Sequence, residues 1–269
     1  MLPKNPDPPL PPSALERFEE ILPRPPARPA VFLDYDGTLA PIARRPEEAL
    51  LPEATREAVR RLAGRSPVAI VSGRDLAELK ALVGLPGLAY AGSHGFDVET
   101  PEGPATLGPA RDRFRPALDA AERDLRARTR GLPGVFVERK RSSVALHHRL
   151  AASDCAALAA KAFWDVRASR PELRAIEGKR VFELLPAIEW DKGRAVLALA
   201  ERFRKDGGDF VPLYLGDDTT DEDAFRAVRD AGVGIAVLEA PRPTAARYRL
   251  ASVEEVRRFL ERLAERLGA

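Results

Sequence analysis

The sequence lacks several features that would place it among special classes of protein. Its 269 residues include one cysteine, Cys155, so an internal disulfide and a cysteine-based zinc cluster are excluded. No stretch approaches the roughly 20 consecutive apolar residues that a membrane-spanning helix needs. The first residues also lack the hydrophobic region of a signal peptide. We therefore expect a cytoplasmic protein that has no membrane partner.

No charge of one sign dominates the chain. The 43 lysines and arginines face 41 aspartates and glutamates, which leaves a formal net charge of +2. A chain so close to neutral gives no support for nucleic-acid binding. The arginine-rich stretch 111–130 contains interleaved acidic residues. It is therefore expected to form a solvated amphipathic helix rather than a basic patch.

Proline is abundant but unevenly distributed, with ten of the 25 prolines in the first 30 residues. This composition predicts an N-terminal tail over residues 1–29. In residues 30–107 and 187–269, apolar runs alternate with helical patterns. Such alternation predicts an α/β fold, with a parallel sheet and helices on both faces. Residues 108–186 do not show this alternation. They contain patterns of paired strands and long helices, which predict an inserted α+β cap domain.

Two carboxylates directly follow a short apolar run. Residues 30–33 predict a buried strand that ends at Asp34, and Asp36 follows two positions later. Ligand sites of α/β proteins lie at such strand ends. Gly37 permits a sharp turn, and Thr38 offers a hydroxyl and an N–H to an anion. Asp-x-Asp-Gly also forms ordinary turns, but three further motifs favour a site for phosphate and a divalent metal.

The three further polar motifs follow in a fixed order along the chain. Ser72 and Gly73 come after the apolar run 68–71, where they suit phosphate binding, although they could simply precede a capped helix. Lys192 opens a helical stretch, where the helix dipole disfavours a positive charge. A phosphate nearby would remove this conflict, although a solvated lysine is an equal alternative. Five acidic residues then lie within seven positions, Asp217, Asp218, Asp221, Glu222 and Asp223. Capping of a helix would use one or two of them, so the others predict a Mg²⁺ site.

Together the four motifs resemble the haloacid dehalogenase (HAD) phosphohydrolase superfamily. Within it, Tyr-Asp-Gly-Thr-Leu-Ala-Pro-Ile (35–42), Tyr-Ala-Gly-Ser-His-Gly (90–95) and Gly-Asp-Asp-Thr-Thr-Asp-Glu (216–222) resemble the trehalose-6-phosphate phosphatases. The similarity runs from about residue 30 to about residue 267. It implies a Rossmann-like HAD core with an inserted cap. It also implies hydrolysis of the phosphate ester of trehalose 6-phosphate with Mg²⁺ as the cofactor.

The resemblance implies a chemical role for the core residues. Asp34 would be the nucleophile that forms an aspartyl-phosphate. Asp36 would protonate the leaving sugar oxygen and then deprotonate the attacking water. Ser72, Gly73 and Lys192 would bind the phosphoryl oxygens and stabilise charge in the transition state.

The same resemblance implies a metal site. Mg²⁺ would be held by the Asp34 carboxylate, the backbone carbonyl of Asp36 and Asp217, with waters completing the octahedron. Asp218 and Asp221 would lie beside these ligands and orient them, rather than bind the ion.

Four charged residues of the expected cap match, in type and order, the family residues that hold the distal glucose hydroxyls. They are Glu138, Arg149, Lys179 and Glu183. Charge-assisted hydrogen bonds suit this task, although the four could also be surface charges on an exposed sheet face. Lys179 and Glu183 have the same parity and would share one side of a strand. His94 either lines the cleft beneath the cap or completes a structural turn.

The leading hypothesis is a Mg²⁺-dependent phosphatase that converts trehalose 6-phosphate to trehalose and phosphate. A functional link to a trehalose-phosphate synthase stays open. One alternative is the same chemistry on sucrose 6-phosphate or mannosyl-3-phosphoglycerate. A second alternative is a catalytically silent sugar-phosphate-binding module, against which the intact motifs argue.

Overall fold

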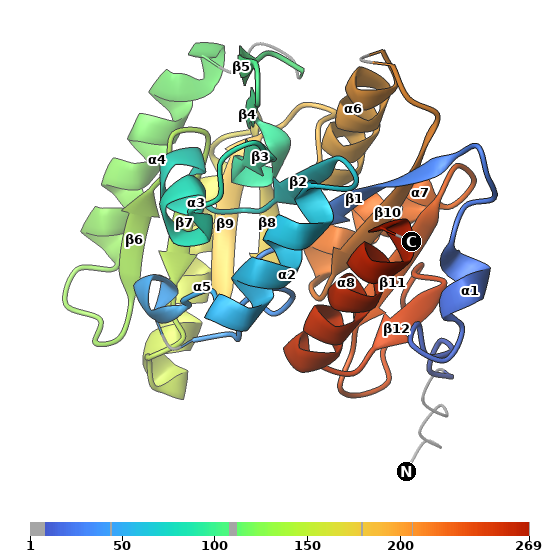
Figure 1. Ribbon diagram of the computed structural model, residues 1–269. Coiled ribbons are helices and arrows are strands. Elements are labelled where there is room, and N and C mark those ends of the chain that lie inside the picture. The colour runs from blue at the N-terminus through green and yellow to red at the C-terminus, as the bar shows by residue number, and fades with distance from the viewer. Residues whose placement is uncertain (1–8, 44, 108–111, 179, 206, 269) are drawn as a thin grey trace.

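The computed structural model describes residues 9–43, 45–107, 112–178, 180–205 and 207–268. Within them the chain forms two β-sheets (Figure 1). The strands of the larger sheet are β1 (Arg28–Leu33), β2 (Val68–Val71), β3 (Ala89–Gly92), β4 (Asp97–Thr100), β5 (Gly103–Ala105), β10 (Phe210–Gly216), β11 (Val233–Val237) and β12 (Tyr248–Leu250). Their order is β12-β11-β10-β1-β2-β3-β4-β5. The first six in this order run parallel. Strand β4 pairs antiparallel with β3, and β5 pairs antiparallel with β4.

Helices cover both faces of the larger sheet. They are α2 (Glu53–Ala63), α3 (Leu76–Val83), α6 (Lys192–Lys205), α7 (Glu222–Val228) and α8 (Val253–Gly268). Successive strand residues point to opposite faces. In β1, Val31 and Leu33 therefore pack with α2, α3 and α8, whereas Ala30 and Phe32 pack with α6 and α7. A parallel sheet between two helical layers confirms the predicted α/β fold.

Part of the proline-rich N-terminal segment packs against the larger sheet. Ser13 forms an isolated parallel bridge with Arg249 of β12. The short helix α1 (Phe18–Ile21) then buries both of its terminal residues. The ring of Phe18 lies 5.4 Å from that of Phe259 in α8. Ala14, Phe18 and Ile21 therefore join the core, so this part of the predicted tail lies against the larger sheet.

The smaller sheet has a hydrophobic core of its own. Its strands are β6 (Phe136–Arg139), β7 (Val144–His147), β8 (Leu173–Gly178) and β9 (Val181–Pro186), in the antiparallel order β6-β7-β9-β8. The helices α4 (Arg115–Arg128) and α5 (Ser153–Ala168) pack on it in one buried cluster, which includes Leu118 of α4, Phe163 of α5 and Leu184 of β9. We call these elements the small unit and the larger sheet with its helices the large unit. The separate core supports the proposal of an inserted cap at residues 108–186, of which 108–111 and 179 lie outside the described residues.

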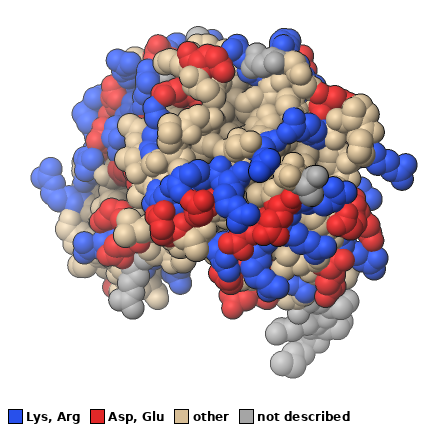
Figure 2. All heavy atoms as spheres, in the orientation of Figure 1, with Lys and Arg blue, Asp and Glu red and all other residues tan. Residues whose placement is uncertain are grey.

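Basic and acidic side chains are interspersed on the surface, and Figure 2 shows both signs mixed over the face in view. The predicted arginine-rich helix is α4, which buries Leu118, Ala121 and Leu125. On its surface Arg126 pairs with Glu122 at 2.9 Å. The expectation of a solvated amphipathic helix is thus confirmed. Among the described helices, none combines the length and the apolar character that crossing a membrane requires.

The parallel strands place three of the predicted motifs at one edge of the sheet. Asp34, Ser72 and Asp217 directly follow the last residues of β1, β2 and β10, which are neighbours in the sheet. The described loops that adjoin this edge contain the single-turn helices η1 (Pro46–Glu48), η2 (Ser93–Gly95) and η4 (Thr219–Asp221), and η3 (Asp112–Phe114) precedes α4. A cavity at this edge is lined by residues of both units.

Candidate active site

Three buried carboxylates meet at the floor of this cavity, which Asp34 and Asp217 line, while Asp221 is fully buried beside them. Asp34, Asp217 and Asp221 each offer an oxygen, and these oxygens lie within 4.8 Å of one another. The turn after Asp36 passes close to them. At Gly37, which has a φ of 82°, an added Cβ would lie 2.1 Å from Oδ2 of Asp217. Glycine is therefore required where the Asp-x-Asp-Gly turn meets the second acidic motif.

Asp221 uses both of its oxygens to organise the surrounding groups. Its Oδ1 accepts hydrogen bonds from Lys192 Nζ at 2.7 Å and from the Tyr214 hydroxyl at 2.6 Å. Its Oδ2 accepts from the backbone N–H groups of Asp217 and Asp218, each at 2.8 Å. Burial alone would raise the pKa of Asp221, but Lys192 and these hydrogen bonds lower it. The contacts support the predicted role of Asp221 beside the metal ligands.

Lys192 sits between two of the carboxylates. Its Nζ lies 2.7 Å from Asp34 Oδ1 and 2.7 Å from Asp221 Oδ1. Burial would lower the pKa of Lys192, but the two carboxylates raise it above the usual value. Burial, followed by the charges of Asp221 and Asp217, raises the pKa of Asp34 despite the lysine. Three carboxylates and one ammonium leave a buried excess of negative charge, which a divalent cation would neutralise.

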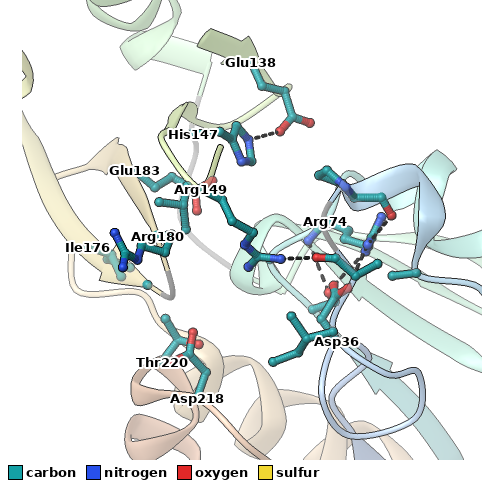
Figure 3. A pocket seen from close by; sticks show the side chains of 18 of the residues that line it. Asp36, Arg74, Glu138, His147, Arg149, Ile176, Arg180, Glu183, Asp218 and Thr220 are labelled. Carbon is teal, nitrogen blue, oxygen red and sulfur yellow. Dashed lines mark hydrogen bonds and ion pairs between the residues drawn. The ribbon is translucent and has the colours of Figure 1, made fainter. Parts of the chain in front are cut away.

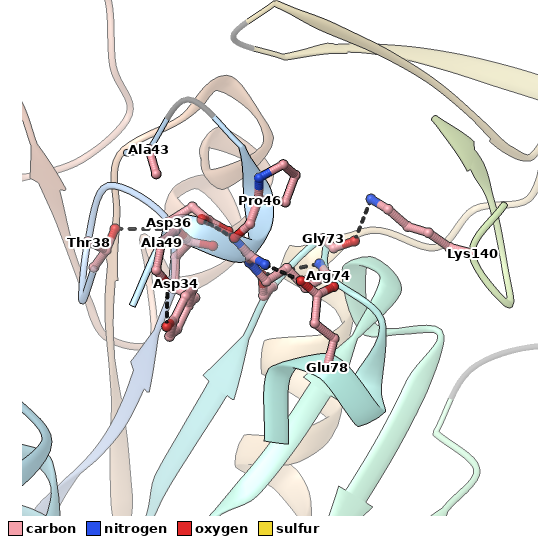
Figure 4. Close-up of polar contacts among 12 residues, drawn as sticks. Asp34, Asp36, Thr38, Ala43, Pro46, Ala49, Gly73, Arg74, Glu78 and Lys140 are labelled. Atoms are coloured by element: carbon pink, nitrogen blue, oxygen red, sulfur yellow. Dashed lines mark hydrogen bonds and ion pairs between the residues drawn. The ribbon is translucent and has the colours of Figure 1, made fainter. Parts of the chain in front are cut away.

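Asp36 is held by an arginine that our sequence interpretation did not single out. Arg74 donates from Nε and Nη2 to the two carboxylate oxygens of Asp36, each at 2.7 Å (Figure 4). Its Nη1 contacts Glu78, and its guanidinium lies over the ring of Tyr35. A bidentate arginine fixes both the position and the orientation of a carboxylate. The signal in the sequence is the position of Arg74 directly after Ser72 and Gly73.

The Ser72–Gly73 loop is rigidly supported. The Ser72 N–H donates to Ala91 O, and its carbonyl accepts from the His94 N–H, both at 2.9 Å. Its Oγ accepts from the Arg74 N–H at 3.2 Å. At Gly73 an added Cβ would lie 2.7 Å from the His94 ring. Both loop residues line the cavity together with Asp34 and Lys192.

The small unit brings three of the four predicted sugar ligands to the same cavity. Glu138, Arg149 and Glu183 line it (Figure 3), while Lys179 lies outside the described residues. Glu138 Oε2 lies 2.7 Å from His147 Nε2. Arg149 donates to a backbone carbonyl of the loop that follows Asp36. The two units therefore face each other across one cavity.

Lys140 is a further cavity residue that sequence reasoning missed. Its Nζ donates to Glu183 Oε1 and to the carbonyl of Gly73, each at 3.1 Å, as Figure 4 shows for the second contact. Burial would lower the pKa of Lys140, but Glu183 and Glu138 raise it. The available signal was parity, because Lys140 lies two positions after Glu138 and so extends the same side of β6.

Comparison with known proteins identifies relatives for nearly the whole chain. The trehalose-phosphatase family model matches residues 32–254. The trehalose-phosphate phosphatase of Mycobacterium tuberculosis is 44% identical over 244 residues, which cover 89% of this chain and 62% of that protein. The chain thus spans slightly less than two thirds of that relative. The probable trehalose-phosphate phosphatase D of Arabidopsis thaliana is 39% identical over 266 residues, 94% of this chain and 72% of that protein.

A solved structure shares the fold. The C-terminal domain of the C. albicans trehalose-6-phosphate phosphatase superposes with a TM-score of 0.78 and 23% identity, covering 95% of this chain and 98% of that one. The likeness establishes the architecture. It agrees with the predicted HAD-type α/β fold.

Proposed function

This chain belongs to the trehalose-phosphatase family, and we propose that it is a phosphoric monoester hydrolase that converts trehalose 6-phosphate to trehalose and phosphate. The observation that carries the proposal is one cavity shared by two sets of residues. Its floor holds the carboxylates, lysine and loop amides that phosphoryl transfer needs. Its other wall, from the small unit, holds charged side chains that suit sugar hydroxyls.

The proposed reaction starts at Asp34. One carboxylate oxygen attacks phosphorus, and the bond between phosphorus and the sugar oxygen breaks as the aspartyl-phosphate forms. Asp36 supplies the proton that the leaving sugar oxygen takes up. A water then attacks phosphorus and gives its proton to Asp36, which is now ionised. The bond between phosphorus and the Asp34 oxygen breaks, which releases phosphate and regenerates Asp34. Both Asp36 carboxylate oxygens accept from Arg74 in the structure, so one of them must turn away from the arginine to carry a proton to the sugar oxygen.

Lys192, Ser72 and Gly73 would receive the phosphoryl group. Because its pKa is raised, Lys192 stays protonated at neutral pH and offsets the charge that accumulates as a carboxylate approaches a phosphate. Ser72 offers its hydroxyl and Gly73 its amide from a loop that is already held by hydrogen bonds. Such pre-organised donors lose little freedom when the phosphate binds.

The carboxylate cluster fits Mg²⁺. Its donors are hard oxygens, which this ion prefers, and its net negative charge favours a divalent cation. Asp34, the Asp36 carbonyl and Asp217 would hold the ion. When bound, it would neutralise phosphate charge and so reduce the repulsion of the attacking carboxylate. Asp221 and Asp218, the capping residue of η4, would keep the Asp217 loop in shape.

The small unit would select the sugar. We propose that Glu138, Lys140, Arg149 and Glu183 bind hydroxyl groups of the glucose distal to the phosphate, and Lys179 stays a prediction. Contact between the two units would also exclude water from the reacting groups until the sugar leaves. Selection against sucrose 6-phosphate or mannosyl-3-phosphoglycerate would rest on the same side chains. A functional link to a trehalose-phosphate synthase, which would supply the substrate, also stays a prediction.

The test is phosphate release from a panel of four compounds with Mg²⁺ and with EDTA: trehalose 6-phosphate, sucrose 6-phosphate, glucose 6-phosphate and mannosyl-3-phosphoglycerate. We expect trehalose 6-phosphate to be hydrolysed at least about 100-fold faster than the others, since charge-assisted contacts are worth a few kcal/mol. Faster hydrolysis of another sugar phosphate would refute the proposed substrate but not the core chemistry. Absence of hydrolysis throughout the panel would favour a silent binding module.

A further inference from the structure

A strained turn between β3 and β4 carries His94. Its three residues, Ser93, His94 and Gly95, have φ values of 50°, 57° and 90°. A residue with a side chain loses roughly 1–2 kcal/mol in this left-handed region. Two such residues in succession therefore need support from their surroundings. Backbone strain of this kind is found mostly at functional sites, where it holds a side chain in a particular orientation.

The turn braces the phosphate-binding loop from the large unit. The Ser93 N–H donates to Arg74 O at 2.7 Å, and the His94 N–H donates to Ser72 O at 2.9 Å. The imidazole packs directly on Gly73, where an added Cβ would lie 2.7 Å from Cε1 of the ring. His94 thus contacts the backbone that is proposed to bind the phosphate.

The same imidazole contacts the small unit. Nε2 of His94 lies 3.0 Å from Glu183 Oε2, and both side chains are buried. Glu183 Oε1 accepts from Lys140 Nζ at 3.1 Å and from Ser143 Oγ at 2.5 Å. Lys140 returns to the loop, donating to the carbonyl of Gly73 at 3.1 Å. Gly73, His94, Glu183 and Lys140 therefore form a closed ring of contacts across the two units.

We infer that His94 is a positioning residue that couples the sugar-binding side chains to the phosphate-binding loop. The inference rests on the proposed function. Glu183 and Lys140 already contact His94 and Gly73. A sugar that binds Glu183 and Lys140 is therefore held in a fixed position relative to the phosphate-binding loop. His94 acts through these contacts. Its Nδ1 is buried and has no hydrogen-bond partner within the described part of the chain, and its Nε2 faces Glu183.

Two substitutions separate this coupling from the support of the turn. Asparagine tolerates positive φ better than most residues, but its amide ends near the position of Nδ1 and does not reach Glu183. Glutamine places an amide N–H near the position of Nε2 and can keep the contact. His94→Asn should therefore break the ring of contacts, and His94→Gln should preserve most of it. If His94→Asn does not fold, His94→Gly, which relieves the left-handed strain, replaces it with the same expectation.

The readout is kcat/KM on two substrates, trehalose 6-phosphate and p-nitrophenyl phosphate, which has no distal sugar. We expect His94→Asn to lower kcat/KM for trehalose 6-phosphate by about 10- to 100-fold, the scale of a small misplacement of reacting groups. Hydrolysis of p-nitrophenyl phosphate should fall much less than that of trehalose 6-phosphate. The backbone N–H groups of residues 93 and 94 still hold the loop in the variant, and this substrate has no sugar for Glu183 and Lys140 to position. His94→Gln should recover most of the loss.

A double-mutant cycle with Glu183→Gln completes the test. If the two residues act through one contact, the double variant should be about as slow on trehalose 6-phosphate as the worse single variant. Multiplicative losses, or equal losses on both substrates, would overturn the coupling. A wild-type protein that hydrolyses p-nitrophenyl phosphate but not trehalose 6-phosphate would instead refute the proposed function, and with it the inference.

Discussion

Replacing Lys192 with methionine should destabilise the fold and make its stability depend on divalent cations. Methionine matches the length and volume of the lysine stem but lacks the ammonium that lies 2.7 Å from both Asp34 and Asp221. All three side chains are at most 6% exposed. The substitution therefore leaves buried carboxylates without their cation.

The magnitude follows from this geometry. Removing one partner of a buried ion pair costs about 3–5 kcal/mol of the free energy of unfolding, because the remaining charge is uncompensated. In a protein of this size each kcal/mol lowers Tm by about 2–4 °C, so the loss corresponds to roughly 6–20 °C. Since the pKa of Asp34 is already raised and would rise further, folding takes up a proton there. The free energy of unfolding of the variant should thus increase as the pH falls from 7.5 toward 5.5.

The assay is thermal unfolding of the wild type and of Lys192→Met in EDTA and in a Mg²⁺ series, at pH 5.5 and 7.5. Arg194→Met is the matched control, because Arg194 lies on the same helix in an exposed pair with Glu189 at 2.9 Å. We expect the control to change Tm little. Equal shifts in the two variants, independent of Mg²⁺ and of pH, would refute the buried-charge argument.

Three further predictions concern the metal site. Arg242→Gln should weaken Mg²⁺ binding about 10-fold, because Arg242 donates to the carbonyl of Asp217 at 3.2 Å and pairs with Glu222 at 2.6 Å. Calorimetric titration with Mg²⁺ measures the affinity, and an unchanged affinity would contradict the prediction. Gly37→Ala should abolish turnover and lower Tm, since the new Cβ would lie 2.1 Å from Oδ2 of Asp217; normal phosphate release would show that this contact is not close. EDTA should remove activity on trehalose 6-phosphate and excess Mg²⁺ should restore it, so activity that persists in EDTA would exclude a metal requirement.

Much of the fold and of the cavity floor could be predicted from the sequence because they follow from periodicity. Alternating apolar runs and helical patterns predict parallel strands, and the carboxyl ends of such strands share one edge. Asp34, Ser72 and Asp217 could therefore be brought together before any coordinates were known. Their separation along the chain does not matter once the strands are parallel.

The contacts between distant segments could not be predicted in this way. Arg74 reaches Asp36 from 38 positions away, and that pairing depends on how the loops after β1 and β2 lie. Lys140 approaches Gly73 only because the β6–β7 turn packs on the large unit. The left-handed φ of His94 has no signature in the sequence, since non-glycine residues rarely adopt it. These are tertiary properties, and local patterns carry little information about them.

The most direct test of the central claim is a comparison of Asp34→Asn with the wild type, with turnover and binding of trehalose 6-phosphate measured on the same preparations in Mg²⁺. An amide is too weak a nucleophile to attack phosphorus, so phosphate release should fall by at least about 1,000-fold. Calorimetry should still detect binding of trehalose 6-phosphate, because Lys192 and Ser72 can still bind its phosphate and the small unit can still bind its sugar. Phosphate release close to the wild-type rate would contradict Asp34 as the nucleophile and, with it, the proposed mechanism.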